Sequence, residues 1–180
     1  MKSTPFYILR LSITLLLVTA LVAAALACIN AITKEQIAAN KDAKLQQAIA
    51  QVLPGNVGTP SAEAVNSGIV KNLYRTDAGY AVEVAPAGFN AEITMMVGIV
   101  DGEVTGIAIV SHTETAGLGA VAGAPSNAGQ AFRDQFIGAS DKLAVDKDGG
   151  NIDSLTGATI TSRAIAEGVN AALDYISTLG

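Results

Sequence analysis

The sequence predicts an α+β protein in which one N-terminal transmembrane helix is followed by a small antiparallel-sheet domain. Residues 11–33 contain no charged side chain. Four segments of apolar and β-branched residues follow between residues 69 and 111, with no helical pattern between them. Apolar residues then recur at helical spacing in residues 162–177. A run of strands that precedes the domain's main helix favours an α+β fold.

The uncharged segment is long enough to cross a bilayer. Its 23 residues, Leu11–Thr33, would span about 35 Å as a helix, and the hydrocarbon core of a bilayer is about 30 Å thick. Phe6–Leu9 extend the segment upstream across Arg10. A cleaved signal peptide would have a shorter apolar core of about 7 to 15 residues, so we expect residues 1–33 to be a membrane anchor. Basic residues flank both ends, so the positive-inside rule gives no orientation.

The anchor is expected to continue as a helix from Thr33 to Leu53. Its apolar residues fall at helical spacing, and Pro54-Gly55 would end it. The segment Gly55–Ser67 is small and polar, which predicts a linker or loop. The predicted division is therefore a membrane anchor at 1–33, a helix and linker at 34–66, and a folded domain at 67–180.

Four strands are predicted at the start of this domain. Ile69–Arg75 and Tyr80–Val84 are separated by Thr76-Asp77-Ala78-Gly79, a hairpin turn signal. Ala91–Val100 and Val104–Ser111 are separated by Asp101-Gly102-Glu103, and Asp-Gly between apolar runs is a strong hairpin signal. Two consecutive hairpins predict an antiparallel sheet.

The rest of the domain is less regular. A Gly/Ala-rich passage occupies His112–Gly129, followed by a short predicted helix at Gln130–Phe136 and a last strand at Lys142–Val145. A final helix is predicted for Ser162–Ser177. Its predicted apolar stripe consists of Ile165, Val169, Leu173 and Ile176.

Composition excludes several kinds of function. Residues 34–180 carry nine Lys and Arg against sixteen Asp and Glu, a net charge of −7 without a basic patch, which argues against nucleic-acid binding. The only histidine is His112, so no catalytic or metal site built on several histidines is expected. The only cysteine is Cys28, which we interpret as a small apolar residue in the anchor; the domain therefore has neither disulfides nor iron–sulfur clusters.

Two segments could carry chemistry. Asp153–Ser162 offers four hydroxyls before a helix N-terminus; this is either an ordinary N-cap or an anion site that holds a phosphate beside Thr159 or Thr161. The second segment, His112–Gly119, follows a strand; it is either an irregular crossover or a glycine loop that lets the backbone approach a flat ligand.

Both segments resemble motifs of the FMN-binding domain family. Thr156-Gly157-Ala158-Thr159, with Asp153 before it and Ile160-Thr161-Ser162 after it, is similar to the family's flavinylation motif. Glu114-Thr115-Ala116-Gly117-Leu118-Gly119 resembles the second signature, E-T-P-G-L-G, with Ala116 in place of proline, a departure that removes a fixed φ from the loop. The order of elements also agrees over nearly the whole chain, and chain length favours the G subunits of Rnf complexes within the family.

The resemblance implies a function for each motif. It implies FMN attached through a phosphoester to Thr159 by a magnesium-dependent flavin transferase that uses FAD, with Asp153 helping to mark or activate the site. The other implied cofactor-binding residues are Glu114, Thr115, Gly117, Leu118, Gly119, Leu155, Thr156, Gly157, Ala158 and Thr161. No catalytic or metal-binding residue is implied.

The resemblance also implies a place in the cell. The chain would be a single-pass membrane subunit with its domain on the extracytoplasmic side, relaying electrons in a ferredoxin–NAD oxidoreductase whose other subunits move the ions. Two alternatives stay open: a flavoprotein subunit of another respiratory chain, such as a sodium-pumping NADH–quinone reductase, and a tethered interaction module without a cofactor.

Overall fold

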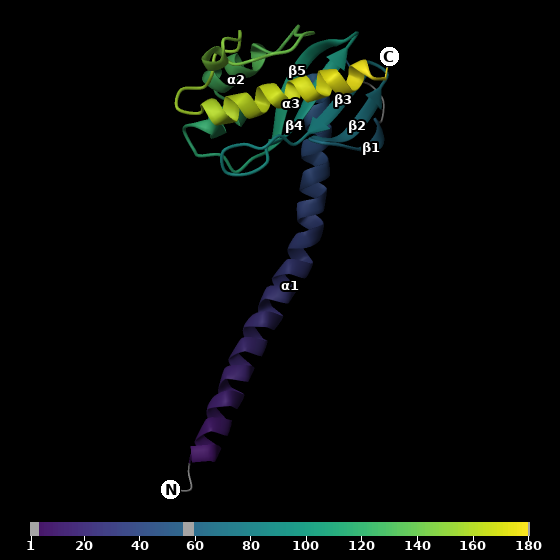
Figure 1. The fold of residues 1–180 in the computed structure, drawn as a ribbon. Coiled ribbons are helices and arrows are strands. Elements are labelled where there is room, and N and C mark those ends of the chain that lie inside the picture. The colour runs from purple at the N-terminus through teal and green to yellow at the C-terminus, as the bar shows by residue number, and fades with distance from the viewer. Residues whose placement is uncertain (1–3, 56–59, 180) are drawn as a thin grey trace. The chain divides into compact units, whose positions relative to one another are not determined.

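The computed structural model describes residues 4–55 and 60–179, and the chain divides into two compact units, Met1–Ala43 and Lys44–Gly180. The first unit belongs to helix α1 (Thr4–Val52), which contains one candidate membrane span by length and composition, Phe6–Lys34, with a mean hydropathy of 2.5 (Figure 1). The hydroxyls of Thr14 and Thr19 donate to the carbonyl oxygens of Arg10 and Leu15, four residues earlier, so both are satisfied within the helix.

The second unit is built on a five-stranded antiparallel sheet in the order β1-β2-β3-β4-β5. The strands are β1 (Ser61–Ser67), β2 (Val70–Thr76), β3 (Gly79–Val84), β4 (Thr94–Val100) and β5 (Glu103–Ser111). Both predicted hairpins are confirmed. Asp101 and Gly102 have φ values of 51° and 82°, the left-handed pair that a tight two-residue hairpin requires.

The predicted loop over Gly55–Ser67 is wrong for Ser61–Ser67, which form β1 and pair with β2; residues 56–59 lie outside the described residues. Most of the described side chains of β1 are exposed and small, and Val65 packs into the core. The residues of β1 have little β propensity of their own, so this edge strand forms because it pairs with β2.

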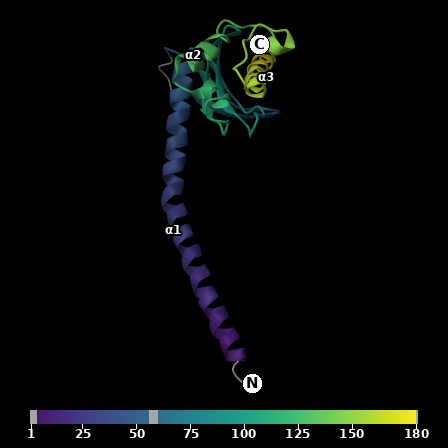
Figure 2. The same ribbon diagram turned by 90° about the vertical axis from the view of Figure 1, so that its left-hand side faces the viewer.

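Each face of the sheet has its own core. The larger core lies between one face and helix α3 (Thr159–Ser177), with Val82, Met95 and Ile165 fully buried in it. Figure 1 shows α3 running across the sheet, and Figure 2 shows it nearly end-on beside the sheet. The last turns of α1, within the second unit, cover the other face through Ile49 and Val52. The helix predicted to reach Leu53 is thus confirmed to within one residue of its end.

Three short elements lie between β5 and α3 along the chain: η1 (Gly119–Gly123), α2 (Asn127–Asp134) and η2 (Asp146–Asp148). Helix α2 begins three residues before the predicted start, because Ser126 caps it by accepting a hydrogen bond from the Gly129 amide.

The strand predicted at Lys142–Val145 is wrong. The Asn170 side chain takes both backbone groups of Leu143, at 2.8 Å each, and Val145 makes only an isolated bridge to Ile152. With its peptide groups bonded to a side chain, this segment cannot join a strand ladder.

Candidate functional site

A cavity of about 320 Å³ opens where the glycine loop meets the N-terminus of α3. The two segments singled out in the sequence, 47 residues apart at Glu114 and Thr161, both contribute to its wall. Eight of the residues proposed from sequence line it: Glu114, Thr115, Leu118, Gly119, Gly157, Ala158, Thr159 and Thr161. Two lining residues, Phe89 and Ile160, were not foreseen.

Three proposed residues lie near the cavity but do not line it. Leu155 is half-buried against the larger core, and Thr156 is exposed in the turn before α3. Gly117 adopts a φ of +77°, and a Cβ built on it would meet no atom within 4 Å. Glycine is therefore needed at 117 for its backbone conformation.

The start of α3 is formed by a tight turn. The Ala158 amide donates to the Leu155 carbonyl at 2.9 Å, and Gly157 takes the left-handed conformation at φ +71°. The first helical bond runs from the Ser162 amide to the Ala158 carbonyl at 3.0 Å, so the helix begins at Thr159, three residues before the predicted start.

Helix α3 has no side-chain cap at its N-terminus. Ala158 occupies the N-cap position, and none of the hydrogen bonds among the described residues pairs the amides of Thr159, Ile160 or Thr161. Of the two interpretations left open for this segment, the ordinary N-cap formed by a hydroxyl is therefore wrong. Unpaired amides at the positive end of a helix dipole form an environment suited to an anion.

The two candidate threonines differ sharply in their surroundings. The Thr161 side chain is buried, and its hydroxyl donates to Glu114 Oε2. Thr159 lines the cavity and is half-buried, and its hydroxyl takes part in no hydrogen bond within the described part of the chain. An incoming group could reach the Thr159 oxygen directly, while the Thr161 oxygen is already occupied.

Glu114 connects the walls of the cavity. Its Oε1 accepts from the amides of Phe89 at 2.9 Å and Asn90 at 3.1 Å, and its Oε2 accepts from Thr161. The Asn90 side chain adds a bond to the Thr113 carbonyl at 2.9 Å. The segment before β4, the loop after β5 and α3 are thus joined at one carboxylate.

The glycine loop is held by its own turns despite alanine at position 116. The Thr115 carbonyl accepts from the amides of Leu118 at 3.1 Å and Ala120 at 3.2 Å. His112 contributes a ring nitrogen, Nδ1, that accepts from the Glu114 amide at 3.3 Å. The imidazole of His112 therefore helps to order this loop and does not line the cavity.

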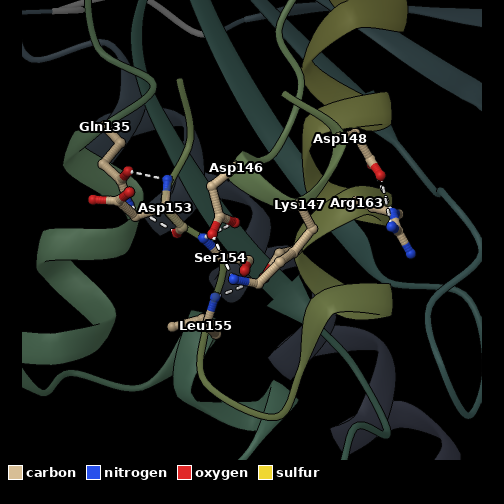
Figure 3. Close-up of polar contacts among 9 residues, drawn as sticks. Gln135, Asp146, Lys147, Asp148, Asp153, Ser154, Leu155 and Arg163 are labelled. Atoms are coloured by element: carbon tan, nitrogen blue, oxygen red, sulfur yellow. Dashed lines mark hydrogen bonds and ion pairs between the residues drawn. The ribbon is translucent and has the colours of Figure 1, made fainter. Parts of the chain in front are cut away.

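Polar contacts also hold the segment that leads into the threonine motif (Figure 3). Asp146 accepts from the Ser154 amide at 3.0 Å and pairs with Lys147 at 2.9 Å. The side chain of Ser154 first, then Lys147, then the Ser154 amide hold the pKa of Asp146 well below its usual range. Gln135 binds the backbone of Asp153 on both sides, accepting from its amide at 2.7 Å and donating to its carbonyl at 3.3 Å. The motif is therefore fixed before the helix begins.

A second ion pair joins this segment to α3. Arg163 donates twice to Asp148, at 2.6 Å for each bond. Figure 3 shows the two side chains directed toward each other. The hydrogen bonds and charge of Arg163 lower the pKa of Asp148, and those of Asp148 raise the pKa of Arg163. Bidentate geometry of this kind fixes orientation, so the pair aligns the first turn of α3 with the η2 loop.

The mouth of the cavity is apolar. Phe89 is 63% exposed, Ile160 48% and Leu118 42%, and all three line the cavity. Large apolar side chains exposed together around a cavity with a few polar groups are typical of a binding site for a flat, largely apolar ligand.

Comparison with known proteins agrees with this geometry. The sequence profile of the FMN-binding domain matches residues 88–174, which include both walls of the cavity, and the profile of the RnfG N-terminal region matches residues 1–52.

Whole-chain relatives give the same result. The G subunit of an ion-translocating oxidoreductase complex from Vibrio cholerae serotype O1 (strain M66-2) is 35% identical over 87% of this chain and 88% of its own length. The protein of that name from Methanosarcina acetivorans is 29% identical over 94% of this chain and 95% of its own. The G subunit of a proton-translocating ferredoxin:NAD(+) oxidoreductase complex from Clostridium ljungdahlii is 42% identical over 55% of this chain and 54% of its own.

Proposed function

Because this chain belongs to the family of G subunits of ion-translocating oxidoreductase complexes, we propose that it is a membrane-anchored subunit that relays electrons through FMN in a complex of this kind. The complex would be a ferredoxin–NAD oxidoreductase, as the name of the Clostridium relative states for that protein. The observation that carries the proposal is the cavity at the α3 N-terminus, where a free threonine hydroxyl, unpaired amides and an apolar mouth meet.

The residues of the cavity fit the parts of FMN. FMN joins a flat, largely apolar ring system to an anionic phosphate. Phe89, Leu118 and Ile160 offer apolar surface for the ring, and the α3 amides offer donors for the phosphate. Ligand cavities measure about 300–1,000 Å³, so 320 Å³ would enclose part of the cofactor and leave the rest accessible to a partner.

We place the attachment at Thr159 through a phosphoester. The Thr159 oxygen would bond to the flavin phosphorus of FAD, the bond between the two phosphates of FAD would break, and AMP would leave with the hydroxyl proton. The linked phosphate keeps one negative charge, which the α3 N-terminus stabilises. Gly157 and Ala158 carry little side-chain bulk, so they leave the approach to Thr159 open to a flavin transferase.

When bound, the flavin supplies the electron-transfer chemistry, and the protein supplies position and electrostatics. The residues that would border it are the lining residues proposed from sequence, together with Phe89 and Ile160. Leu155, Thr156 and Gly117 would act indirectly: the first two shape the turn before α3, and Gly117 shapes the glycine loop. Ion movement would belong to partner subunits, since one span cannot form a channel.

The division into an anchor over residues 1–33, a helix and linker over 34–66 and an FMN-binding domain from 67 remains part of the proposal, with β1 moved from the linker into the domain. We also propose that the domain lies on the extracytoplasmic side of the membrane, following the family pattern.

In-gel fluorescence tests the proposal most simply. The full-length protein, produced together with a flavin transferase, is denatured and run on a gel under ultraviolet light. We expect a yellow-green band, because a phosphoester survives denaturation. A dark band, with the transferase shown to be active on another substrate, would favour a module that carries no covalent cofactor.

A further inference from the structure

We propose that Glu114 is a positioning residue that lowers the reduction potential of the flavin, because its buried carboxylate is held by dipoles and by no cation. The inference rests on the proposed function, since it concerns the flavin that the cavity would hold. It adds an electrostatic role to the place of Glu114 in the lining of the cavity.

The carboxylate is buried and fully engaged. Glu114 is 8% exposed, and it accepts hydrogen bonds from the amides of Phe89 and Asn90 and from the hydroxyl of Thr161, which is 2% exposed. The Glu114 carboxylate, with all three donors directed at its oxygens, therefore lies in the wall of the cavity.

Two glycines enclose this carboxylate. A Cβ built on Gly88 would lie 2.6 Å from Glu114 Oε1, and one built on Gly119 would lie 2.6 Å from Oε2 and 2.5 Å from the Thr161 oxygen. Any larger residue at either position would displace the carboxylate, so the backbone at both positions is fitted to it. This enclosure leaves Glu114 only 8% exposed, which weakens the screening of its charge by water.

Glu114 has no cationic partner in the described part of the chain. The ion pairs there join Arg75 with Glu63, Lys147 with Asp146, and Arg163 with Asp148, all at the surface. Hydrogen-bond dipoles reduce the field of a carboxylate, but they do not cancel its charge.

The uncancelled charge would act on the flavin. Reduction adds electrons to the ring system, and a nearby anion in a low-dielectric wall opposes the added negative charge. The phosphoester on Thr159 would bring a second anion to the same helix N-terminus, so the α3 dipole would be shared between the two. Glu114 therefore favours the oxidised flavin and makes the reduced flavin a stronger electron donor.

Two substitutions separate charge from shape. Glu114→Gln removes the charge and keeps the shape, because the amide oxygen can accept from Phe89 and Asn90 and the Thr161 hydroxyl can turn to accept from the amide nitrogen. We expect the midpoint potential of the flavin to rise. Thr161→Val keeps the charge and removes one donor, so the field of the carboxylate is less reduced and the potential should fall. Glu167→Gln, on the exposed face of α3, is the control and should leave the potential unchanged.

The test is a redox titration of the full-length flavoprotein and its three variants, at pH 8 and followed by flavin absorbance. Shifts of opposite sign in Glu114→Gln and Thr161→Val support the inference. Equal potentials in all proteins, or shifts of the same sign in both variants, would overturn it and leave Glu114 a structural residue. If Glu114→Gln takes up no flavin, the sign of the Thr161→Val shift decides alone. An unmutated protein without flavin would instead overturn the proposed function, and this inference with it.

Discussion

Gly119→Ala is the substitution whose effect the structure predicts most sharply. Gly119 is buried, and an added Cβ would lie 2.5 Å from the Thr161 oxygen, 2.6 Å from Glu114 Oε2 and 3.1 Å from Glu114 Cβ. The methyl group can be accommodated only if the hydrogen bond between Glu114 and Thr161 opens. Overpacking a core costs about 1–3 kcal/mol, and losing a hydrogen bond to a charged group costs about 1.5–3 kcal/mol.

The two effects are not fully additive, so we expect the free energy of unfolding to fall by about 2–5 kcal/mol. A domain of this size is stable by about 5–15 kcal/mol, so the variant should still fold. Two other glycines are matched controls. Gly117→Ala meets no neighbour but must adopt φ +77°, which costs about 1–2 kcal/mol. Gly106→Ala makes only ordinary contacts, at 3.6 Å or more, and should be neutral or stabilising by up to about 1 kcal/mol.

The assay is urea unfolding of the full-length protein in mild detergent, followed by far-ultraviolet circular dichroism. For an m value of about 2 kcal/mol/M, the midpoint of Gly119→Ala should fall by about 1–2.5 M. Visible circular dichroism of the bound flavin should change in the same variant, because the wall of the cavity moves. A midpoint equal to that of Gly106→Ala, with an unchanged visible spectrum, would refute the close packing around Glu114.

Three further predictions concern the approach to the site, the acid response and the topology. Gly157→Ala, at φ +71° and with its Cβ 3.1 Å from Leu118 Cδ2, should destabilise the turn by about 1–2 kcal/mol and slow flavin attachment measured by intact mass; normal attachment would contradict this. The pKa of Asp146 is lower in the folded than in the unfolded state, so its contribution to stability is complete above about pH 5 and is lost as the pH falls. The melting temperature of Asp146→Asn should therefore change less with acidification than that of the unmutated protein. Parallel pH profiles of the two melting temperatures would count against the contact with Ser154. A cysteine placed at exposed Ser61 should react with an impermeant thiol reagent in intact cells, and reaction only after the membrane is breached would reverse the proposed orientation.

Elements with a strong local pattern could be predicted from the sequence. The apolar runs of β2 to β5 and the Asp101-Gly102 turn carry their structure in a few adjacent residues, and both hairpins formed as predicted. The edge strand β1 could not be predicted, because its small polar residues take strand conformation only through pairing with β2. The strand predicted at Lys142–Val145 is wrong for the opposite reason. The side chain of Asn170, distant in sequence, bonds the Leu143 amide and carbonyl that a strand would need for pairing.

The site shows the same limit. Both motif segments stood out by their hydroxyls and glycines, a family resemblance supplied the ligand, and the structure brings the two segments together at one cavity. Phe89 was missed because it belongs to neither motif and reaches the cavity only through the fold, although a Phe between Gly88 and Asn90 in the loop before β4 was a usable signal. Thr161 was named as a cofactor-binding residue, and the contact of its hydroxyl with Glu114, 47 residues away, could not be predicted because no local pattern joins the two positions.

The most direct test of the central claim is the intact mass of three proteins produced together with a flavin transferase. We predict an FMN-sized increment on the unmutated protein and on Thr161→Ala, and none on Thr159→Ala, which should remain folded because its hydroxyl makes no hydrogen bond within the described residues. An increment that survives in Thr159→Ala and is lost in Thr161→Ala would contradict the account, since the attached hydroxyl would then be the buried one that Glu114 holds.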